Sequence, residues 1–341
     1  MLTSINTATF KPVTLGVDPS SILAVIPAFN EARHIETCIR TLMRGSPLLR
    51  LVPLTVADGG STDETVAIVK RLMAEFPNLR LLENKKRLQS AAINRAAADH
   101  ATPGTRWLIR CDAHSAYPPN FILHVAEALK RTGAASVVIP MDAVGETCFE
   151  KANAWVVDTL IGSGGSAHRG GRRSQYADHG HHAGFDIVWF RSVGGYDEAF
   201  SHNEDAEYDY RVCKSGGRVW LDADIRIDYT PRGSVRALAR QYFNYGKGRA
   251  QNLRKHKARL KLRQSAPISM LALCLAGLVV GLFQWQALLL PAGYLSVLAG
   301  ASAAIALKHK SACGLLSGLA AGTMHLAWAA GFTWESVAGK R

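Results

Sequence analysis

The sequence predicts an α/β domain built on a parallel sheet, followed by helices that cross a membrane. Over about the first 140 residues, short apolar runs typical of buried strands alternate with segments of helical periodicity. Residues 265–307 then form a run of 43 residues without Asp, Glu, Lys or Arg, and residues 311–334 add 24 more. Directly before the long run, residues 247–263 contain eight Lys or Arg and no acid.

The expected strands are short apolar runs that end at a turn or at polar residues. Residues 22–26 are wholly apolar and end at Pro27, and the later runs are of the same kind. Between them, apolar residues recur three or four positions apart, which predicts helices with one buried face. The expected strands are 22–26, 51–57, 79–82, 107–109 and 135–139, and the expected helices are 33–44, 62–76, 88–100 and 120–131.

Past residue 141 the alternation becomes irregular. Residues 162–182 are rich in Gly, His and Arg, and we expect a mobile loop there. Residues 206–212 return to helical spacing. The ligand of a parallel sheet binds beyond the carboxyl ends of its strands, so polar residues that follow the strands directly are candidate site residues.

The long uncharged run is sufficient for two membrane crossings of roughly 20 residues each. We place them at about 267–283 and 287–307, with a turn at residues 284–286. A third crossing at about 314–334 is richer in Gly and Ala, and two or three crossings remain open. A buried soluble helical domain is the alternative, but soluble helices of this length show a polar stripe and these do not.

The basic block before the first crossing predicts the orientation, because Lys- and Arg-rich flanks stay in the cytoplasm. The first 20 residues contain no apolar core of the signal-peptide kind. We therefore expect a membrane protein in which residues 1 to about 263 lie in the cytoplasm. The expected organisation is an N-terminal extension at 1–20, an α/β domain at 21–250, a basic juxtamembrane segment at 251–264 and membrane helices at 265–335.

Composition excludes several classes of protein. Apolar residues make up 48% of the chain, which excludes a disordered protein. The net charge is +13, from 40 basic and 27 acidic residues, but without the basic block it falls to +5. Since that block adjoins a membrane segment, it indicates anionic lipid headgroups rather than nucleic acid. The six cysteines show no paired spacing, which argues against a disulfide scaffold or zinc site and suits a reducing compartment.

Two motifs follow expected strands and point to nucleotide chemistry. Residues 27–31, PAFNE, follow the first strand, and residues 58–65, DGGSTDET, follow the second. Each alone is typical of a turn and a helix cap, but together they can hold a nucleoside, with Phe29 as a stacking surface. Asp112 and His114 follow the fourth strand and point the same way in an extended chain, so both can reach one divalent ion that neutralises a leaving diphosphate.

Two further motifs remain ambiguous from the residues alone. Glu204 and Asp205 lie at the start of a helical segment, either as favourable N-terminal acids or as a general base. Residues 240–249, RQYFNYGKGR, are equally well explained as an interfacial helix with aromatic anchors and as a basic element near a diphosphate.

In their order along residues 20–250, the motifs PAFNE, DGGSTDET, DAH, GGYDE and NED resemble the family 2 glycosyltransferases, whose catalytic domain has the GT-A fold, a Rossmann-like nucleotide-sugar-binding fold. Three longer stretches, NKKRLQSAAINRA, CDAHSAYP and HHAGF…FSHNEDAEYDYRV (His181 to Val212), are similar to those of succinoglycan-type exopolysaccharide glucosyltransferases. His114 replaces the last Asp of the family's D-x-D motif, which leaves the preferred metal open. The Q-x-x-R-W motif of processive synthases is absent, which favours addition of a single sugar.

The resemblance implies a role for each matching residue. Pro27, Phe29 and Glu31 would contact the nucleoside, Asp58 the uracil ring, and Arg87 the nucleotide. Asp112 and His114 would hold Mg²⁺ or Mn²⁺ against the diphosphate. Asp205, with Glu204 beside it, would deprotonate the acceptor hydroxyl in an inverting reaction. For the acceptor we expect contacts from His181, His182, Gln241 and Arg249, with the loop from His168 to His182 closing over it.

The implied activity is transfer of glucose from UDP-glucose to a polyprenyl-diphosphate-linked saccharide in bacterial exopolysaccharide biosynthesis, with a β-1,3 bond. Expected partners are the UDP-sugar, the lipid-linked acceptor, inner-membrane lipids and other polysaccharide-assembly proteins, but not nucleic acid. Two alternatives remain. One is a transferase that loads a sugar onto polyprenyl phosphate itself, and the other is a non-catalytic membrane protein that binds nucleotide sugars.

Overall fold

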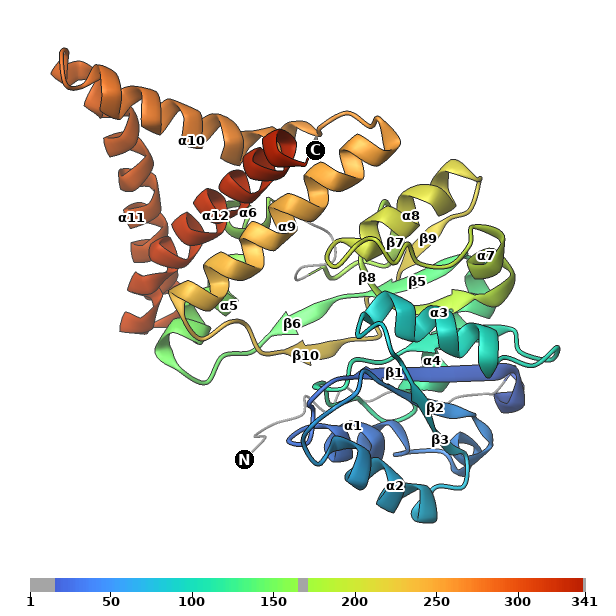
Figure 1. The fold of residues 1–341 in the computed structure, drawn as a ribbon. Coiled ribbons are helices and arrows are strands. Elements are labelled where there is room, and N and C mark those ends of the chain that lie inside the picture. The colour runs from blue at the N-terminus through green and yellow to red at the C-terminus, as the bar shows by residue number, and fades with distance from the viewer. Residues whose placement is uncertain (1–15, 165–170, 340–341) are drawn as a thin grey trace. The chain divides into compact units, whose positions relative to one another are not determined.

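The computed structural model describes residues 16–164 and 171–339. The contacts divide the chain into two compact units (Figure 1). The sheet unit consists of residues 1–142 and 170–228, and the helical unit consists of residues 143–169 and 229–341. The division therefore lies at other points than the expected boundaries after residues 250 and 264, because residues 235–256 form a helix that packs within the helical unit.

The sheet unit is an eight-stranded sheet with helices on both faces, which confirms the α/β class. Its strand order is β3-β2-β1-β4-β8-β5-β9-β7. The strands are β1 (Ile22–Ala28), β2 (Leu54–Asp58), β3 (Leu79–Glu83), β4 (Trp107–Arg110), β5 (Ser136–Ile139), β7 (Gln175–Ala177), β8 (His181–Asp186) and β9 (Val219–Leu221). The helices are α1 (Ile35–Leu42), α2 (Thr65–Glu75), α3 (Gln89–Asp99), α4 (Phe121–Thr132), α7 (Ile187–Ser192) and α8 (Glu204–Lys214).

The sheet is mixed, so the expectation of a wholly parallel sheet is wrong. Strands β1 to β4 are parallel to their neighbours among themselves, as the alternation predicts. Strand β8 is inserted between β4 and β5 and is antiparallel to both. Strand β7 lies inside the stretch expected to be a loop, and β8 begins at the end of that stretch. The sequence did not predict these short strands because the stretch is rich in Gly and His, which are not typical of strands. Residues 165–170 of that stretch lie outside the described residues.

The alternation of side chains along β1 explains why this unit has a hydrophobic core on each face of the sheet. Ile22, Ala24 and Ile26 are buried against one face, and Leu23 and Val25 are buried against the other. Successive side chains of a strand point to opposite faces, so a strand covered by helices on both sides is apolar throughout. Burial on both faces fixes the position of the strand in the sheet. It therefore also fixes the edge of the sheet at which the carboxyl ends of the parallel strands meet.

The register of the parallel strands brings the polar segments together. Ala28 pairs with Asp58, and Asp58 pairs with Glu83, so the segments after β1, β2 and β3 leave the sheet at one edge. Val25 pairs with Arg110, so the segment after β4 reaches the same edge. A two-stranded sheet of β6 (Met141–Ala143) and β10 (Ile227–Tyr229) lies where the chain passes from one unit to the other.

The helical unit contains three helices that are long and apolar enough to cross a membrane, counted within the described ranges. They are α10 (Leu262–Val280), α11 (Leu289–His309) and α12 (Ser317–Ala338), the last two each preceded by a short 3-10 helix, η3 (Trp285–Leu288) and η4 (Ala312–Leu316). The other helices of the unit are α5 (Cys148–Val157), α6 (Leu160–Ser163) and α9 (Val235–His256).

A disulfide joins Cys148 to Cys313 in this unit, which the scattered spacing of the six cysteines did not predict. The two cysteines are 165 residues apart, with their Cα atoms separated by 5.0 Å. Sequence spacing reveals local cysteine pairs, whereas this pair is created by the packing of α5 against η4. Cys38, Cys111, Cys213 and Cys274 do not take part in a disulfide.

Candidate active site

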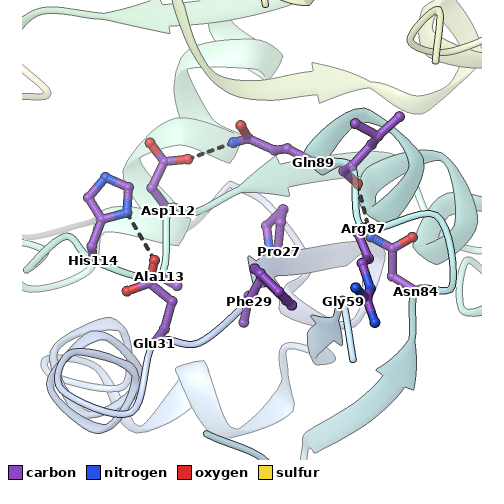
Figure 2. Close-up of a pocket in the computed structure, with 12 residues that line it drawn as sticks. Pro27, Phe29, Glu31, Gly59, Asn84, Arg87, Gln89, Asp112, Ala113 and His114 are labelled. Carbon is purple, nitrogen blue, oxygen red and sulfur yellow. Dashed lines mark hydrogen bonds and ion pairs between the residues drawn. The ribbon is translucent and has the colours of Figure 1, made fainter. Parts of the chain in front are cut away.

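A cavity of about 190 Å³ opens at the carboxyl ends of β1 to β4 (Figure 2). Six of the predicted site residues line it, and Figure 2 shows them around one hollow: Pro27, Phe29, Glu31, Arg87, Asp112 and His114. The remainder of the wall consists of Ala28, Gly59, Asn84, Leu88, Gln89 and Ala113. Four consecutive strand ends therefore build one pocket, as the alternation of strands and helices predicts.

Hydrogen bonds between the first two loops fix the shape of the pocket. Asp58 is buried and accepts hydrogen bonds from the backbone of Gly60 and Ser61. The Ser61 hydroxyl in turn accepts from the Asn30 backbone at 2.8 Å, and the Asn30 side chain accepts from the Thr62 backbone at 2.8 Å. In this structure Asp58 therefore organises the loop beside the pocket but does not line it.

An aromatic and a cationic side chain lie on one side of the pocket. The Phe29 ring is 45% exposed, and the Arg87 guanidinium lies 5.6 Å from its centre. Arg87 has a positive φ of 57°, an uncommon backbone conformation that directs the side chain toward Phe29 and Gly60. A planar base can stack on such a surface, and an anionic phosphate can pair with the guanidinium.

Asp112 and His114 face the pocket from the loop after β4. One oxygen of Asp112 accepts from Gln89 at 3.0 Å, and the other lies 3.4 Å from Nε2 of His181. His114 Nδ1 lies 3.6 Å from a Glu31 oxygen. Burial alone would raise the pKa of Asp112, but Arg110 and His181 outweigh it and lower the pKa, so the carboxylate is ionised.

These residues fit a divalent ion that also binds a substrate. Within residues 16–164 and 171–339, no group of three or more His, Cys, Asp or Glu is arranged to hold a metal ion. Mg²⁺ in nucleotide sites is held by one or two carboxylates together with substrate phosphates, so a site with two protein ligands meets that requirement. The carboxylate of Asp112 and the imidazole of His114 are two groups of this kind on one loop.

A buried arginine, Arg110, connects this pocket to a second acidic site. It is the last residue of β4, and its side chain is 4% exposed. Its Nη1 lies 2.6 Å from Oδ1 of Asp205 and 4.0 Å from Glu204, and its Nε lies 3.5 Å from Asp112. One guanidinium thus has the candidate metal ligand on one side and the candidate base on the other.

Three donors hold one oxygen of Asp205. Besides Arg110, the Tyr196 hydroxyl donates to Oδ1 at 3.2 Å, and Nδ1 of His182 lies 3.2 Å from the same oxygen. No described residue forms a hydrogen bond to the other oxygen, Oδ2, and the side chain is 21% exposed. The carboxylate is therefore fixed through one oxygen, and the second is available to a substrate.

The pKa values of the two neighbouring carboxyl groups, Asp205 and Glu204, are shifted in opposite directions. Burial alone would raise the pKa of Asp205, but Arg110 and His182 push it well below its usual range. Burial, together with the negative charge of Asp205, raises the pKa of Glu204 to about 7. Both lie in the first turn of α8, where the helix dipole favours negative charge. Carboxyl pairs whose pKa values separate in this way are typical of acid–base sites.

The four residues expected to contact the acceptor substrate lie in different surroundings in the structure. His181 lies beside Asp112, with its side chain 13% exposed. His182 is fully buried and contacts Tyr196 and Asp209, so it has no surface to offer an acceptor. Gln241 and Arg249 lie on α9 in the helical unit, where Gln241 donates to the hydroxyls of Tyr229 and Tyr245. His168 and Arg169, at the start of the expected closing loop, lie outside the described residues.

Sequence reasoning missed several residues of the site. The motifs assign no role to Arg110, Tyr196, Asp209 or Gln89, although Arg110 stands two positions before DAH and Tyr196 lies within GGYDE. A charged residue at the end of an apolar strand, two positions before a candidate metal ligand, was the available signal for Arg110. Asp209 follows Asp205 by one helical turn, and this spacing puts both on the face of α8 that meets His182.

Comparison with known proteins identifies the family of this chain. The model of glycosyl transferase family 2 matches residues 23–193. The succinoglycan biosynthesis protein ExoA of Rhizobium meliloti is 44% identical over 317 residues, 93% of this chain and 95% of that protein. The chain belongs to glycosyl transferase family 2. It is therefore an enzyme, an inverting hexosyltransferase.

Two more distant proteins are also similar. A Methanococcus voltae dolichyl N-acetyl-α-D-glucosaminyl phosphate 3-β-D-2,3-diacetamido-2,3-dideoxy-β-D-glucuronosyltransferase is 22% identical over 245 residues, 69% of this chain and 74% of that protein. The mannosyltransferase PcManGT from Pyrobaculum calidifontis, solved with GDP-Man and Mn²⁺, superimposes with a TM-score of 0.59 at 20% identity, over 95% of this chain and 90% of that one. This superposition confirms the GT-A fold of the family 2 enzyme.

Replacement of His182 tests how Asp205 is held. Burial alone would lower the pKa of His182, but Asp209 and Asp205 raise it to about 9, so the ring is an imidazolium at neutral pH. His182→Gln removes a charge-assisted hydrogen bond worth about 1.5–3 kcal/mol, and we expect kcat to fall about 10- to 100-fold with KM for the sugar nucleotide unchanged. Steady-state kinetics measure this split.

The wild-type enzyme should also lose activity as pH rises through about 9, because His182 then loses the positive charge that stabilises the Asp205 carboxylate. The same deprotonation lowers stability. The folded-state pKa lies above the ordinary 6.5, so the stabilisation is complete below 6.5 and disappears between 6.5 and about 9. The fall in activity above about pH 9 should be absent from the pH profile of His182→Gln. If the variant showed the same fall, the titrating group would be a residue other than His182.

Proposed function

We propose that this enzyme transfers glucose from UDP-glucose to a polyprenyl-diphosphate-linked saccharide at the bacterial inner membrane, with the sheet unit in the cytoplasm and a β-1,3 bond formed. The observation that supports it most directly is the position of Arg110, which contacts both Asp112 and Asp205. A donor bound at the pocket would then have its diphosphate near Asp112 and its sugar toward Asp205.

In the proposed mechanism the pocket holds the nucleotide, with Phe29 against the base and Arg87 near the phosphates. Asp112 and His114 would hold Mg²⁺ or Mn²⁺, which would supply positive charge against the leaving diphosphate. Oδ2 of Asp205 accepts the proton of the acceptor hydroxyl as its oxygen attacks the anomeric carbon. The bond from that carbon to the diphosphate breaks, UDP leaves, and the configuration inverts in one displacement.

Several observations support the acceptor and the location. The apolar helices and the preceding basic block suit a membrane enzyme whose acceptor is a lipid. The 44% identical relative is a succinoglycan biosynthesis protein, and the Methanococcus relative is by name a 3-β-transferase acting on a lipid-phosphate-linked sugar. Together they favour a lipid-linked saccharide over bare polyprenyl phosphate.

The test is sugar transfer by purified membranes. UDP-glucose, UDP-galactose and GDP-mannose would be offered with either a polyprenyl-diphosphate-linked galactose or polyprenyl phosphate as acceptor. Transfer from UDP-glucose to the saccharide is the expected result, and methylation analysis of the product gives the linkage. Transfer to bare polyprenyl phosphate would overturn the acceptor assignment, and preference for another donor would overturn the sugar.

Removal of the metal should abolish donor binding as well as transfer. We expect EDTA to eliminate transfer and Mn²⁺ or Mg²⁺ to restore it, since the pocket provides two metal ligands and the diphosphate the others. Calorimetry of UDP binding with and without Mn²⁺ provides a readout independent of activity. Asp112→Asn should remove the effect of Mn²⁺, while Asp99→Asn, on the surface of α3, should leave it intact. Metal-independent UDP binding by the wild type would contradict the assignment.

A further inference from the structure

The third apolar helix of the chain differs from the first two in how much protein covers it. The most apolar stretches of α10 and α11 are 6% and 17% buried within the protein, whereas that of α12 is 44% buried. Leucines along α10, such as Leu275 and Leu278, are about half exposed, as expected of side chains that meet lipid. On α12, by contrast, Ala320, Ala321 and Met324 are buried in a core.

Helix α12 lies along α9 at backbone contact. A Cβ on Gly331 would lie 2.0 Å from the Phe243 carbonyl oxygen, and one on Gly246 would lie 2.1 Å from that of Trp328. Small residues at such positions allow two helices to approach closely. Near the far end of both helices, Nη2 of Arg254 pairs with Glu335 at 2.6 Å. Figure 1 shows the two helices side by side over most of their length.

Helix α9 cannot cross a bilayer. Its 22 residues include six Lys or Arg and no acid, at positions 236, 240, 247, 249, 254 and 255. Each such charge costs about 2.5–3.5 kcal/mol at the centre of a membrane helix, even on the lower of the available scales. Both ends of α9 therefore lie on the same side of the membrane, and the basic residues 257–263 keep the start of α10 there too.

The end of α11 returns to that side. The segment after it is joined to α5 by the Cys148–Cys313 disulfide and by a hydrogen bond from Ser317 Oγ to the Ala152 carbonyl at 3.2 Å. Helix α5 follows β6, and among the described residues before it there is no membrane-spanning candidate. Helix α12 thus begins on the side of α5 and ends at Arg254, on the side of α9.

We propose that the α10–α11 hairpin is the part of this chain that crosses the bilayer, and that α12 lies with α9 along the membrane surface. The apolar hairpin is surrounded by lipid tails, and the cations of α9 meet anionic headgroups. Of the two topologies that the sequence leaves open, the one with two crossings follows, and the end of α12 lies on the same side as the start of α9. This inference does not depend on the sugar or the acceptor.

Labelling of single cysteines tests the sidedness. In a Cys213→Ser background, which removes the exposed thiol, we would introduce Val235→Cys at the start of α9, Phe283→Cys between α10 and α11, and Val337→Cys near the end of α12. The side chains replaced are 40%, 86% and 74% exposed. An impermeant maleimide added to inside-out and right-side-out vesicles should label positions 235 and 337 in the same preparation and 283 in the other. Labelling of 337 together with 283 would overturn the proposal.

Cross-linking gives an independent measurement that does not rely on vesicle orientation. The double variant Arg254→Cys with Glu335→Cys should be joined by a short bismaleimide, because these side chains are in contact. The matched control is Arg254→Cys with Leu319→Cys, whose second position lies near the other, N-terminal end of α12. If α12 crossed the bilayer, position 335 would lie about 30 Å away on the far side and no intramolecular product would form. Equal yields from both pairs, or none from either, would contradict the parallel packing.

Discussion

Asp205→Asn should lower kcat by about 10² to 10⁴, the contribution expected of a general base. The amide has the size of the carboxylate and can still accept a hydrogen bond from Arg110, but it cannot take a proton from the acceptor hydroxyl. Because Asp205 does not line the nucleotide pocket, Mn²⁺-dependent UDP binding should remain within a few-fold of wild type. Single-turnover transfer in membranes measures the change in the rate of transfer, and calorimetry measures the Mn²⁺-dependent binding of UDP.

The matched control is Glu204→Gln, one residue earlier on α8. Glu204 has a pKa of about 7 and lies 4.0 Å from Arg110, without the three donors that hold Asp205. We expect a smaller loss of activity from Glu204→Gln than from Asp205→Asn. The reverse order would assign the base to Glu204 and leave Asp205 as a structural anion. Loss of UDP binding in Asp205→Asn would instead mean that the variant disturbs the whole site.

Arg110→Met should be the most destabilising single change in the site. The methionine has similar length, but it leaves Asp205, Asp112 and Glu204 facing one another with no guanidinium among them. Removing one partner of a buried ion pair costs about 3–5 kcal/mol, which corresponds to roughly 6–20 °C in Tm for a domain of this size. Thermal unfolding of the detergent-solubilised protein measures the change.

Two further variants distinguish the loss of the buried positive charge of Arg110 from the other effects of replacing an arginine. Arg110→Lys keeps the charge but not the planar fork, so we expect an intermediate Tm and low activity. Arg106→Met removes an arginine that pairs with Asp186 at 2.8 Å but is 53% exposed, and such a pair is worth about 1 kcal/mol or less. If Arg110→Met unfolded at the wild-type temperature, the acidic cluster would have to be neutralised in another way, for example by protonation of Glu204.

The nucleotide pocket could be predicted from the sequence because its parts are local. Phe29 and Asp112 each come three positions after an apolar run, and the rule that ligands bind at strand ends is independent of the detailed packing. The mixed sheet could not be predicted. Strand β8 comes from a stretch rich in Gly and His, and only pairing with β4 and β5 makes it a strand. That insertion brings His181 to the pocket and buries His182 behind Asp205.

By itself, the sequence determined the alternation of strands and helices, the pocket residues at the strand ends and the existence of apolar helices after a basic block. These follow from the periodicity and composition of short segments. The tertiary structure decided what joins them: Arg110 to Asp205 across 95 residues, Cys148 to Cys313 across 165, and α9 to α12. Contacts of this kind depend on which surfaces the folded chain brings together, and no local pattern of residues encodes that.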